Sequence, residues 1–141
     1  MRKLVLALTA SVFALAGAAS ANAGEIAVIV KTVNSTFWQN VQKGADAAIA
    51  KQKAHTMTFQ GPAAESAIAD QVNMVENAVN RKVDAILLAP SDPDALVPAV
   101  KKAWEARIPV VIIDSMLSKD AEKYYQSFLA TDNKAAGALA A

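Results

Sequence analysis

Polar and aromatic side chains gather just after two apolar, β-branched runs of the sequence. Lys31 and Asn34 follow the first run, and the adjacent rings of Phe37 and Trp38 come next. Asp114 follows a later run. Aromatic faces stack on the C–H face of a sugar ring, whereas carboxylates, amides and ammonium groups bind its vicinal hydroxyls. These residue types predict a site for a small polar ligand, with a carbohydrate as the first candidate.

Each of these residues also has an ordinary structural role open to it. Phe37 and Trp38 suit the buried start of a helix. Asp114 suits a turn or a helix N-cap, and Lys31 suits a solvated strand end. The residue types alone therefore fit both a ligand site and an ordinary structural role, and the secondary structure that positions them decides between the two.

Strand and helix patterns alternate along the chain after residue 25. Continuous apolar runs indicate strands buried on both faces, and segments with apolar residues at helical spacing lie between them. The expected strands are 26–30, 55–59, 83–89, 109–113 and 126–130, and the expected helices are 36–53, 66–80, 94–107 and 133–141. This alternation predicts an α/β fold, a doubly wound parallel sheet with helices on both faces. Polar residues follow every strand, at the edge where such sheets bind ligands.

Two helical stripes are specific enough to test. The first helix is expected to turn one set toward the core: Phe37, Val41, Ala45, Ala48 and Ile49. The third is expected to turn another set inward: Leu96, Val97, Val100 and Trp104. In the loop before that third helix, Ser91, Asp92 and Asp94 are expected to serve in a turn and N-cap.

Composition and charge exclude several function classes. The chain has 141 residues, of which 54% are hydrophobic and 19% charged, enough apolar surface for one folded domain. The absence of cysteine excludes a disulfide scaffold and a thiolate site, and the single histidine, His55, argues against a metal centre or a Ser-His-Asp triad. His55 is expected to be structural or exposed. A net charge of +1 gives no reason to expect nucleic acid.

Neither a cofactor nor a catalytic constellation is expected. Residues 31–38 hold no glycine, so a dinucleotide-binding loop or a phosphate-binding loop is excluded there. No nucleophile stands near a base at a defensible spacing. We therefore expect a binding protein and not an enzyme, without cofactor or metal.

The N-terminal segment predicts export. Residues 1–3 are a short basic head, about 16 residues of apolar sequence follow, and Ala21-Asn22-Ala23 is a small-x-small triplet. This pattern is typical of a secretory signal peptide over 1–23, cleaved before Gly24, with cleavage after Ala21 as the alternative. The apolar run is shorter than the roughly 20 residues of a membrane-spanning helix. The predicted location is the bacterial periplasm.

Four segments, in order along the chain, carry a family resemblance. They are IAVIVKTVNSTFWQNVQKGADAA, DAILLAPSDPDALVPAVKKA, IPVVIIDS and FLATDN. Together they resemble the N-terminal lobe of periplasmic sugar-binding proteins of the ribose, allose and galactose type, the type I solute receptors of ABC importers. The resemblance extends from about residue 25 to the end. Ser35-Thr36 departs from it, because the family usually has Asn-Pro there.

The resemblance implies ligand contacts at six positions: Lys31, Asn34, Phe37, Trp38, Asp114 and Thr131. The aromatic pair packs on the sugar ring, Asp114 accepts from sugar hydroxyls and Lys31 donates to the ligand. Thr131 matches a small hydroxyl residue near the hinge crossover. Asn34 is either a contact or a residue that holds its loop.

The resemblance also implies an activity and a domain plan. The implied activity is capture of a monosaccharide or polyol for delivery to an ABC permease; a sensory or chemotaxis receptor of the same fold, which would present the ligand to a chemoreceptor, is the alternative. The expected domains are 24–130, an N-terminal sugar-binding lobe, and 131–141, a crossover and the start of a second lobe. Such receptors have two lobes, so a fragment or a truncated gene is expected. The signal peptide argues against a related transcription regulator.

Overall fold

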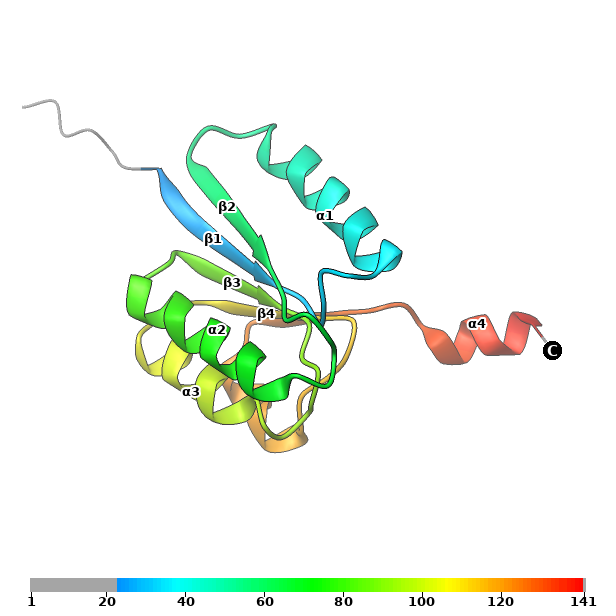
Figure 1. Ribbon diagram of the computed structural model, residues 1–141. Helices are drawn as coiled ribbons and strands as arrows, with labels where there is room; N and C mark the ends of the chain where they lie inside the picture. The colour runs from blue at the N-terminus through cyan, green and yellow to red at the C-terminus, as the bar shows by residue number, and fades with distance from the viewer. Residues whose placement is uncertain (1–22, 141) are drawn as a thin grey trace, which may run out of the picture.

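Five parallel strands form the centre of the molecule in the computed structural model, which describes residues 23–140 (Figure 1). The strands are β1 (Gly24–Ile29), β2 (His55–Gln60), β3 (Ala85–Leu88), β4 (Val110–Ile113) and β5 (Ser127–Leu129). Their order is β2-β1-β3-β4-β5, and every neighbouring pair is parallel. The winding direction changes between β1 and β3, the point where such sheets open a ligand crevice at their carboxyl edge.

Helices cover both faces of this sheet. The helices are α1 (Thr36–Ile49), α2 (Ile68–Arg81), α3 (Val97–Glu105) and α4 (Asn133–Ala140), with a 3₁₀ helix, η1, over Lys119–Tyr124. α1 lies on one face and α2 and α3 lie together on the other, while α4 extends away from the sheet (Figure 1). The predicted α/β fold, a doubly wound parallel sheet with helices on both faces, is confirmed.

The face under α2 and α3 is the closed side of the core. Ile86 and Leu88 of β3 lie beside Val110 and Ile112 of β4, and all four side chains are fully buried. Burying a side chain of this kind contributes roughly 1.5–3 kcal/mol. The continuous apolar runs of the sequence therefore give a rigid sheet, and its carboxyl edge is a fixed platform for the loops that follow.

The other face is held by a smaller cluster under the start of α1. Trp38 is 3% exposed and packs with Val28, Val30 and Ala89. The predicted stripe was wrong in its first member, because Trp38 and not Phe37 turns inward. Ala48, a later member of the same stripe, is exposed as well. The larger indole takes the buried position, and neighbouring residues of a helix point about 100° apart.

Trp104 corrects a second prediction. We expected this residue in the core, but its side chain is 46% exposed. The helix buries the small residues Ala99 and Ala103 beside Val100. Small side chains let α3 lie close to its neighbours, and Trp104, in the last turn, is left at the amino edge of the sheet.

Several helix boundaries differ from the predicted ones. α1 ends at Ile49 rather than at residue 53, α3 begins at Val97 rather than at residue 94, and the 3₁₀ helix was not predicted. The loop before α3 forms the predicted turn, but the predicted N-cap was wrong, because Leu96 takes that position and makes no side-chain cap hydrogen bond. Asp92 shapes the turn before α3, since its Oδ1 accepts the backbone N–H groups of Asp94 and Ala95 at 2.9 and 2.7 Å. These hydrogen bonds hold the pKa of the Asp92 carboxyl below its usual value.

The predicted signal peptide, 1–23, lies outside the described residues except for its last one. Within residues 23–140, every helix is too short or too polar to cross a membrane.

Candidate ligand-binding site

A hollow of about 170 Å³ opens at the carboxyl edge of the sheet, between the start of α1 and the ends of β4 and β5. Four of the six predicted site residues line it: Phe37, Trp38, Asp114 and Thr131. The rest of its wall is apolar and consists of Val41, Ile113, Leu129 and Ala130. Segments far apart in the sequence meet here because parallel strands bring their carboxyl ends to one edge.

The two adjacent aromatic rings have different positions, because one is buried and the other is exposed. Phe37 and Trp38 meet edge to face, with centroids 4.8 Å apart and ring planes at 82°. Trp38 is buried in the α1 cluster, whereas Phe37 is 58% exposed. The indole therefore supports the phenyl ring, and Phe37 presents an open aromatic face at the hollow.

Asp114 is held in an unusual backbone conformation at the end of β4. Its φ of 67° lies in the left-handed region, which residues other than glycine rarely adopt. The N–H of Ser115 donates to the carbonyl of Ile113 at 2.8 Å, and the N–H of Asp114 donates to the carbonyl of Leu129 at 2.9 Å. Asp114 is thus the centre of a strained three-residue turn and not a helix N-cap. Strain of this kind persists at functional sites, where the surrounding structure enforces it.

Lys31, Asp114 and Ser115 form one hydrogen-bonded cluster beside the hollow. The Lys31 ammonium lies 2.7 Å from Asp114 Oδ2 and donates to Ser115 Oγ at 2.6 Å. Ser115 Oγ in turn donates to Asp114 Oδ2 at 3.1 Å. Lys31 is therefore a paired, largely buried residue and not a solvated strand end. The side-chain bonds to Asp114 all use Oδ2, which leaves Oδ1 to accept from a ligand.

Ser115 belongs to this cluster, and the sequence prediction did not include it. The available signal was its place directly after Asp114 at a strand exit. Nothing in the sequence indicates the turn that folds its hydroxyl back onto Asp114, because that contact depends on the left-handed backbone.

Asn34 and Thr131 differ in their relation to the hollow. The Asn34 amide donates to the carbonyl of Ala63 at 2.9 Å, and Thr32 Oγ1 donates to the same carbonyl at 3.2 Å. Asn34 therefore binds the loop after β2, apart from the hollow, as one of its two predicted roles required. Thr131 lies at the rim, where its carbonyl accepts the N–H of Asn133 before α4.

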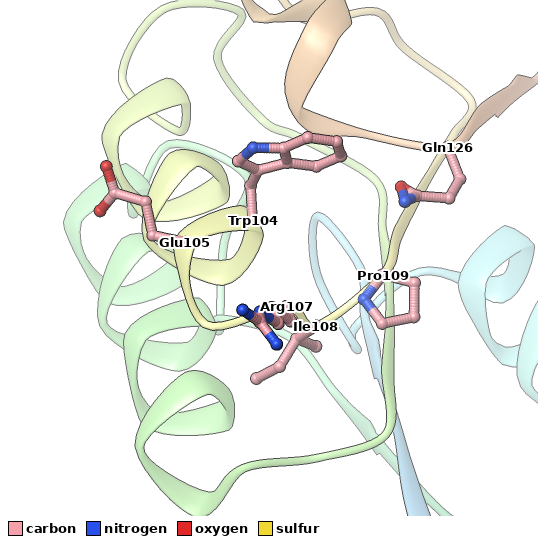
Figure 2. Close-up of a pocket in the computed structure, with 6 residues that line it drawn as sticks. All are labelled: Trp104, Glu105, Arg107, Ile108, Pro109 and Gln126. Carbon is pink, nitrogen blue, oxygen red and sulfur yellow. The ribbon is translucent and has the colours of Figure 1, made fainter.

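A wider hollow lies at the opposite, amino edge of the sheet (Figure 2). It encloses about 520 Å³ and is lined by Trp104, Glu105, Arg107, Ile108, Pro109 and Gln126. Figure 2 shows the Glu105 carboxylate pointing away from the Trp104 ring. None of the predicted site residues lines it, and its polar groups do not form a hydrogen-bonded cluster like that of Lys31. Among the described residues, no group of three or more acidic or histidine side chains is placed to hold a metal ion.

Comparison with known proteins identifies the family and agrees with the fold. Residues 26–141 match the periplasmic binding protein domain. The chain belongs to this family. This periplasmic binding protein is 35% identical over 116 residues to the D-ribose/D-allose-binding protein of Pseudomonas aeruginosa, a match that covers 77% of the chain and 35% of the relative. It is 30% identical to the D-allose-binding periplasmic protein of Escherichia coli, covering 84% and 39% of the two.

A solved structure is far more similar. The crystal structure of an ABC transporter solute binding protein from Agrobacterium vitis, with bound D-fucose, is 96% identical to this periplasmic binding protein. The two superpose with a TM-score of 0.80, over 83% of this chain and 40% of that one. The periplasmic binding protein described here therefore spans less than half the length of the relatives that it matches.

Proposed function

We propose that this chain contributes to capturing a monosaccharide outside the cytoplasm for delivery to an ABC importer. The observation that carries the proposal is the hollow at the carboxyl edge, which Phe37 and Asp114 both line and beside which Lys31 pairs with Asp114. The sugars named for the relatives support it, since these are D-ribose and D-allose, D-allose, and D-fucose.

Binding needs only groups that the chain already holds in place. The sugar ring stacks its C–H face on Phe37. Oδ1 of Asp114 accepts from a sugar hydroxyl. The Lys31 ammonium has three N–H donors, of which two bind Asp114 and Ser115, so the third can donate to the sugar. Thr131 adds a hydroxyl at the rim. No bond of the sugar is made or broken.

The preferred ligand is a sugar with one apolar side. The wall formed by Val41, Ile113 and Leu129 is hydrocarbon, whereas polar groups gather around Asp114. D-fucose carries a methyl group where other hexoses carry a hydroxymethyl group, so it matches such a two-sided hollow. We therefore take D-fucose as the first probe, followed by D-allose and D-ribose.

The hollow is open where Phe37 and Leu129 are exposed. Contacts on one side of a sugar leave much of its surface in water, so we expect this chain to bind with a dissociation constant of about millimolar order. The predicted signal peptide and the periplasmic relative support export to the periplasm. Sequencing the N-terminus of the protein recovered from a periplasmic extract tests this: Gly24 or Asn22 in first place supports it, and an intact Met1 contradicts it.

The binding test is thermal unfolding with and without sugar. A ligand at about a hundred times its dissociation constant adds roughly 2.7 kcal/mol of stability. Sugars also stabilise proteins by exclusion from their surface, so sucrose at equal concentration and the Asp114→Ala variant are the controls. A rise with D-fucose that exceeds the sucrose effect and vanishes in Asp114→Ala supports the proposal. An equal rise for all sugars and both proteins contradicts it.

A further inference from the structure

We propose that Gln71 is a positioning residue of the sugar site. Its buried side-chain amide ties together the ends of β1 and β3 and thereby holds Lys31 within reach of Asp114. That this cluster binds sugar rests on the proposed function, but the position of Lys31 can be measured without any sugar.

Gln71 is a polar side chain in an apolar place. It lies at the end of the first turn of α2, is 0% exposed, and shares its helix face with Val75 and Ala78, which are also fully buried. A buried amide is retained in a core only when its hydrogen-bonding groups are satisfied. The buried Gln71 amide must therefore have hydrogen-bond partners.

Those partners are all backbone groups at the carboxyl edge. Nε2 donates to the carbonyl of Val30 at 3.1 Å and to that of Ala89 at 2.8 Å. Oε1 accepts the N–H of Ser91 at 2.8 Å. A glutamine amide offers two donors and an acceptor, so one side chain makes all three bonds at once.

The Gln71 side chain replaces main-chain hydrogen bonds where the ladder between β1 and β3 ends. The N–H of Ala89 donates to the carbonyl of Ile29 at 2.9 Å. Alternate residues of a strand face the same neighbour, so the next N–H on this side is that of Ser91, and it donates to Gln71 Oε1 instead of to β1. Gln71 therefore bridges the segments that follow β1 and β3. Val30 is also bonded to β2, because its N–H donates to the carbonyl of Gln60 at 2.9 Å.

The bridge bears directly on the site because Lys31 follows Val30. Fixing the Val30 carbonyl fixes the peptide from which the Lys31 side chain leaves. The ammonium then reaches Asp114 at 2.7 Å and Ser115 at 2.6 Å. Gln71 touches none of these groups, so it acts on the ligand only through the backbone that it holds.

Two variants remove the bridge without changing the size of the side chain much. Gln71→Met removes all three hydrogen bonds. Gln71→Glu keeps the acceptor for the Ser91 N–H but turns a carboxylate oxygen toward the carbonyls of Val30 and Ala89. The second variant serves if the methionine variant does not fold.

The matched control is Val75→Ala. Val75 is one turn further along α2, on the same face and equally buried, but it makes no polar contact. Its truncation leaves a cavity and lowers stability. A purely structural role of Gln71 predicts that Gln71→Met and Val75→Ala behave alike.

The experiment records the ¹⁵N signal of the Lys31 ammonium, assigned by its loss in Lys31→Met, together with the unfolding midpoint and the affinity for D-fucose. We expect Gln71→Met to move the Lys31 signal to the position of exposed lysines and to weaken sugar binding roughly tenfold, as loss of supporting residues does at other sites. Val75→Ala should lower the midpoint and leave the signal and the affinity unchanged.

A Lys31 signal that stays in place in both Gln71 variants would overturn the proposal, even if both are less stable. If the parent chain binds no sugar, the proposed function fails, and the Lys31 signal still decides the claim about Gln71.

Discussion

The carboxylate of Asp114 lies 2.7 Å from the ammonium of Lys31, although the Asp114 backbone must adopt a left-handed φ of 67° to bring it there. Two strands separated by β3 in the sheet supply the partners, since Lys31 follows β1 and Asp114 follows β4. The pair therefore couples the ends of strands that do not touch, and it lies beside the hollow that Phe37 borders.

Removing the acceptor should cost more sugar affinity than removing the donor. Asp114→Ala leaves sugar hydroxyls without an acceptor and leaves the Lys31 ammonium unpaired, which we expect to cost about 1.5–3 kcal/mol of binding free energy. Lys31→Ala leaves Asp114 able to accept and should cost less. Titration calorimetry with D-fucose measures both, and equal affinities for Asp114→Ala and the parent chain would remove Asp114 from the site.

The strain at Asp114 predicts a reversal of the usual effect of glycine. Asp114→Gly and Asp114→Ala both lose the carboxylate, but glycine adopts a positive φ without steric cost. We expect the glycine variant to be more stable than the alanine variant by about 1 kcal/mol. Urea unfolding at neutral pH compares them, and an alanine variant of equal or greater stability would contradict the strained turn.

Substitutions of Phe37 and Trp38 should have different effects, one on sugar binding and the other on stability. Phe37→Ala removes an exposed ring, so stability should change by no more than about 0.5 kcal/mol while D-fucose binding is lost. Trp38→Ala opens the buried α1 cluster and should cost about 3–5 kcal/mol of stability. Thermal unfolding and sugar titration of the two variants provide the comparison. A Phe37→Ala variant that binds like the parent would mean that the ring is not part of the site.

The ion pair between Glu25 and Arg81 predicts a small pH dependence of stability away from the site. Arg81 donates a hydrogen bond to Glu25 at 2.8 Å, which holds the pKa of the Glu25 carboxyl below its usual value. A carboxyl with a lower pKa in the folded state stabilises the fold above its unfolded pKa, and this contribution disappears as the pH falls through the folded value. Because both groups are partly exposed, we expect less than about 1 kcal/mol.

Glu25→Gln tests that dependence. It should lower the urea midpoint at about pH 7, and the difference should shrink as the pH falls through the folded pKa of Glu25 and the parent carboxyl becomes protonated as well. Curves of the parent and the variant that run parallel over the whole range would rule out the Glu25–Arg81 contribution.

The strands were predictable from sequence because their apolar runs are short, continuous and separated by helical patterns. Every predicted strand is present, and no predicted end differs from the observed one by more than two residues. The inward faces were harder to predict, since periodicity does not say which of two adjacent aromatics is buried: Trp38 is, and Phe37 is not. Trp104 was mispredicted because an apolar side chain in the last turn of a helix can extend beyond the sheet that it would cover.

The clustering of the candidate site residues was predictable from sequence, and the geometry of the cluster was not. Strand exits identified Lys31 and Asp114, because parallel strands bring their carboxyl ends to one edge. The left-handed turn at Asp114 and the bridge made by Gln71 depend on contacts between distant segments, and no local pattern encodes them. Ser115 was missed for the same reason.

The central claim is that sugar binds at the carboxyl edge of the sheet, and the two tryptophans of the chain mark the two edges. Trp38 lines the hollow beside Asp114, whereas Trp104 lines the hollow at the amino edge (Figure 2). Nitrogen-15 spectra of the two indole N–H groups during a D-fucose titration report on both edges at once. We predict that the Trp38 signal moves in a saturable way while the Trp104 signal stays fixed. Movement of the Trp104 signal alone, or of neither signal with sugar in large excess, would contradict it.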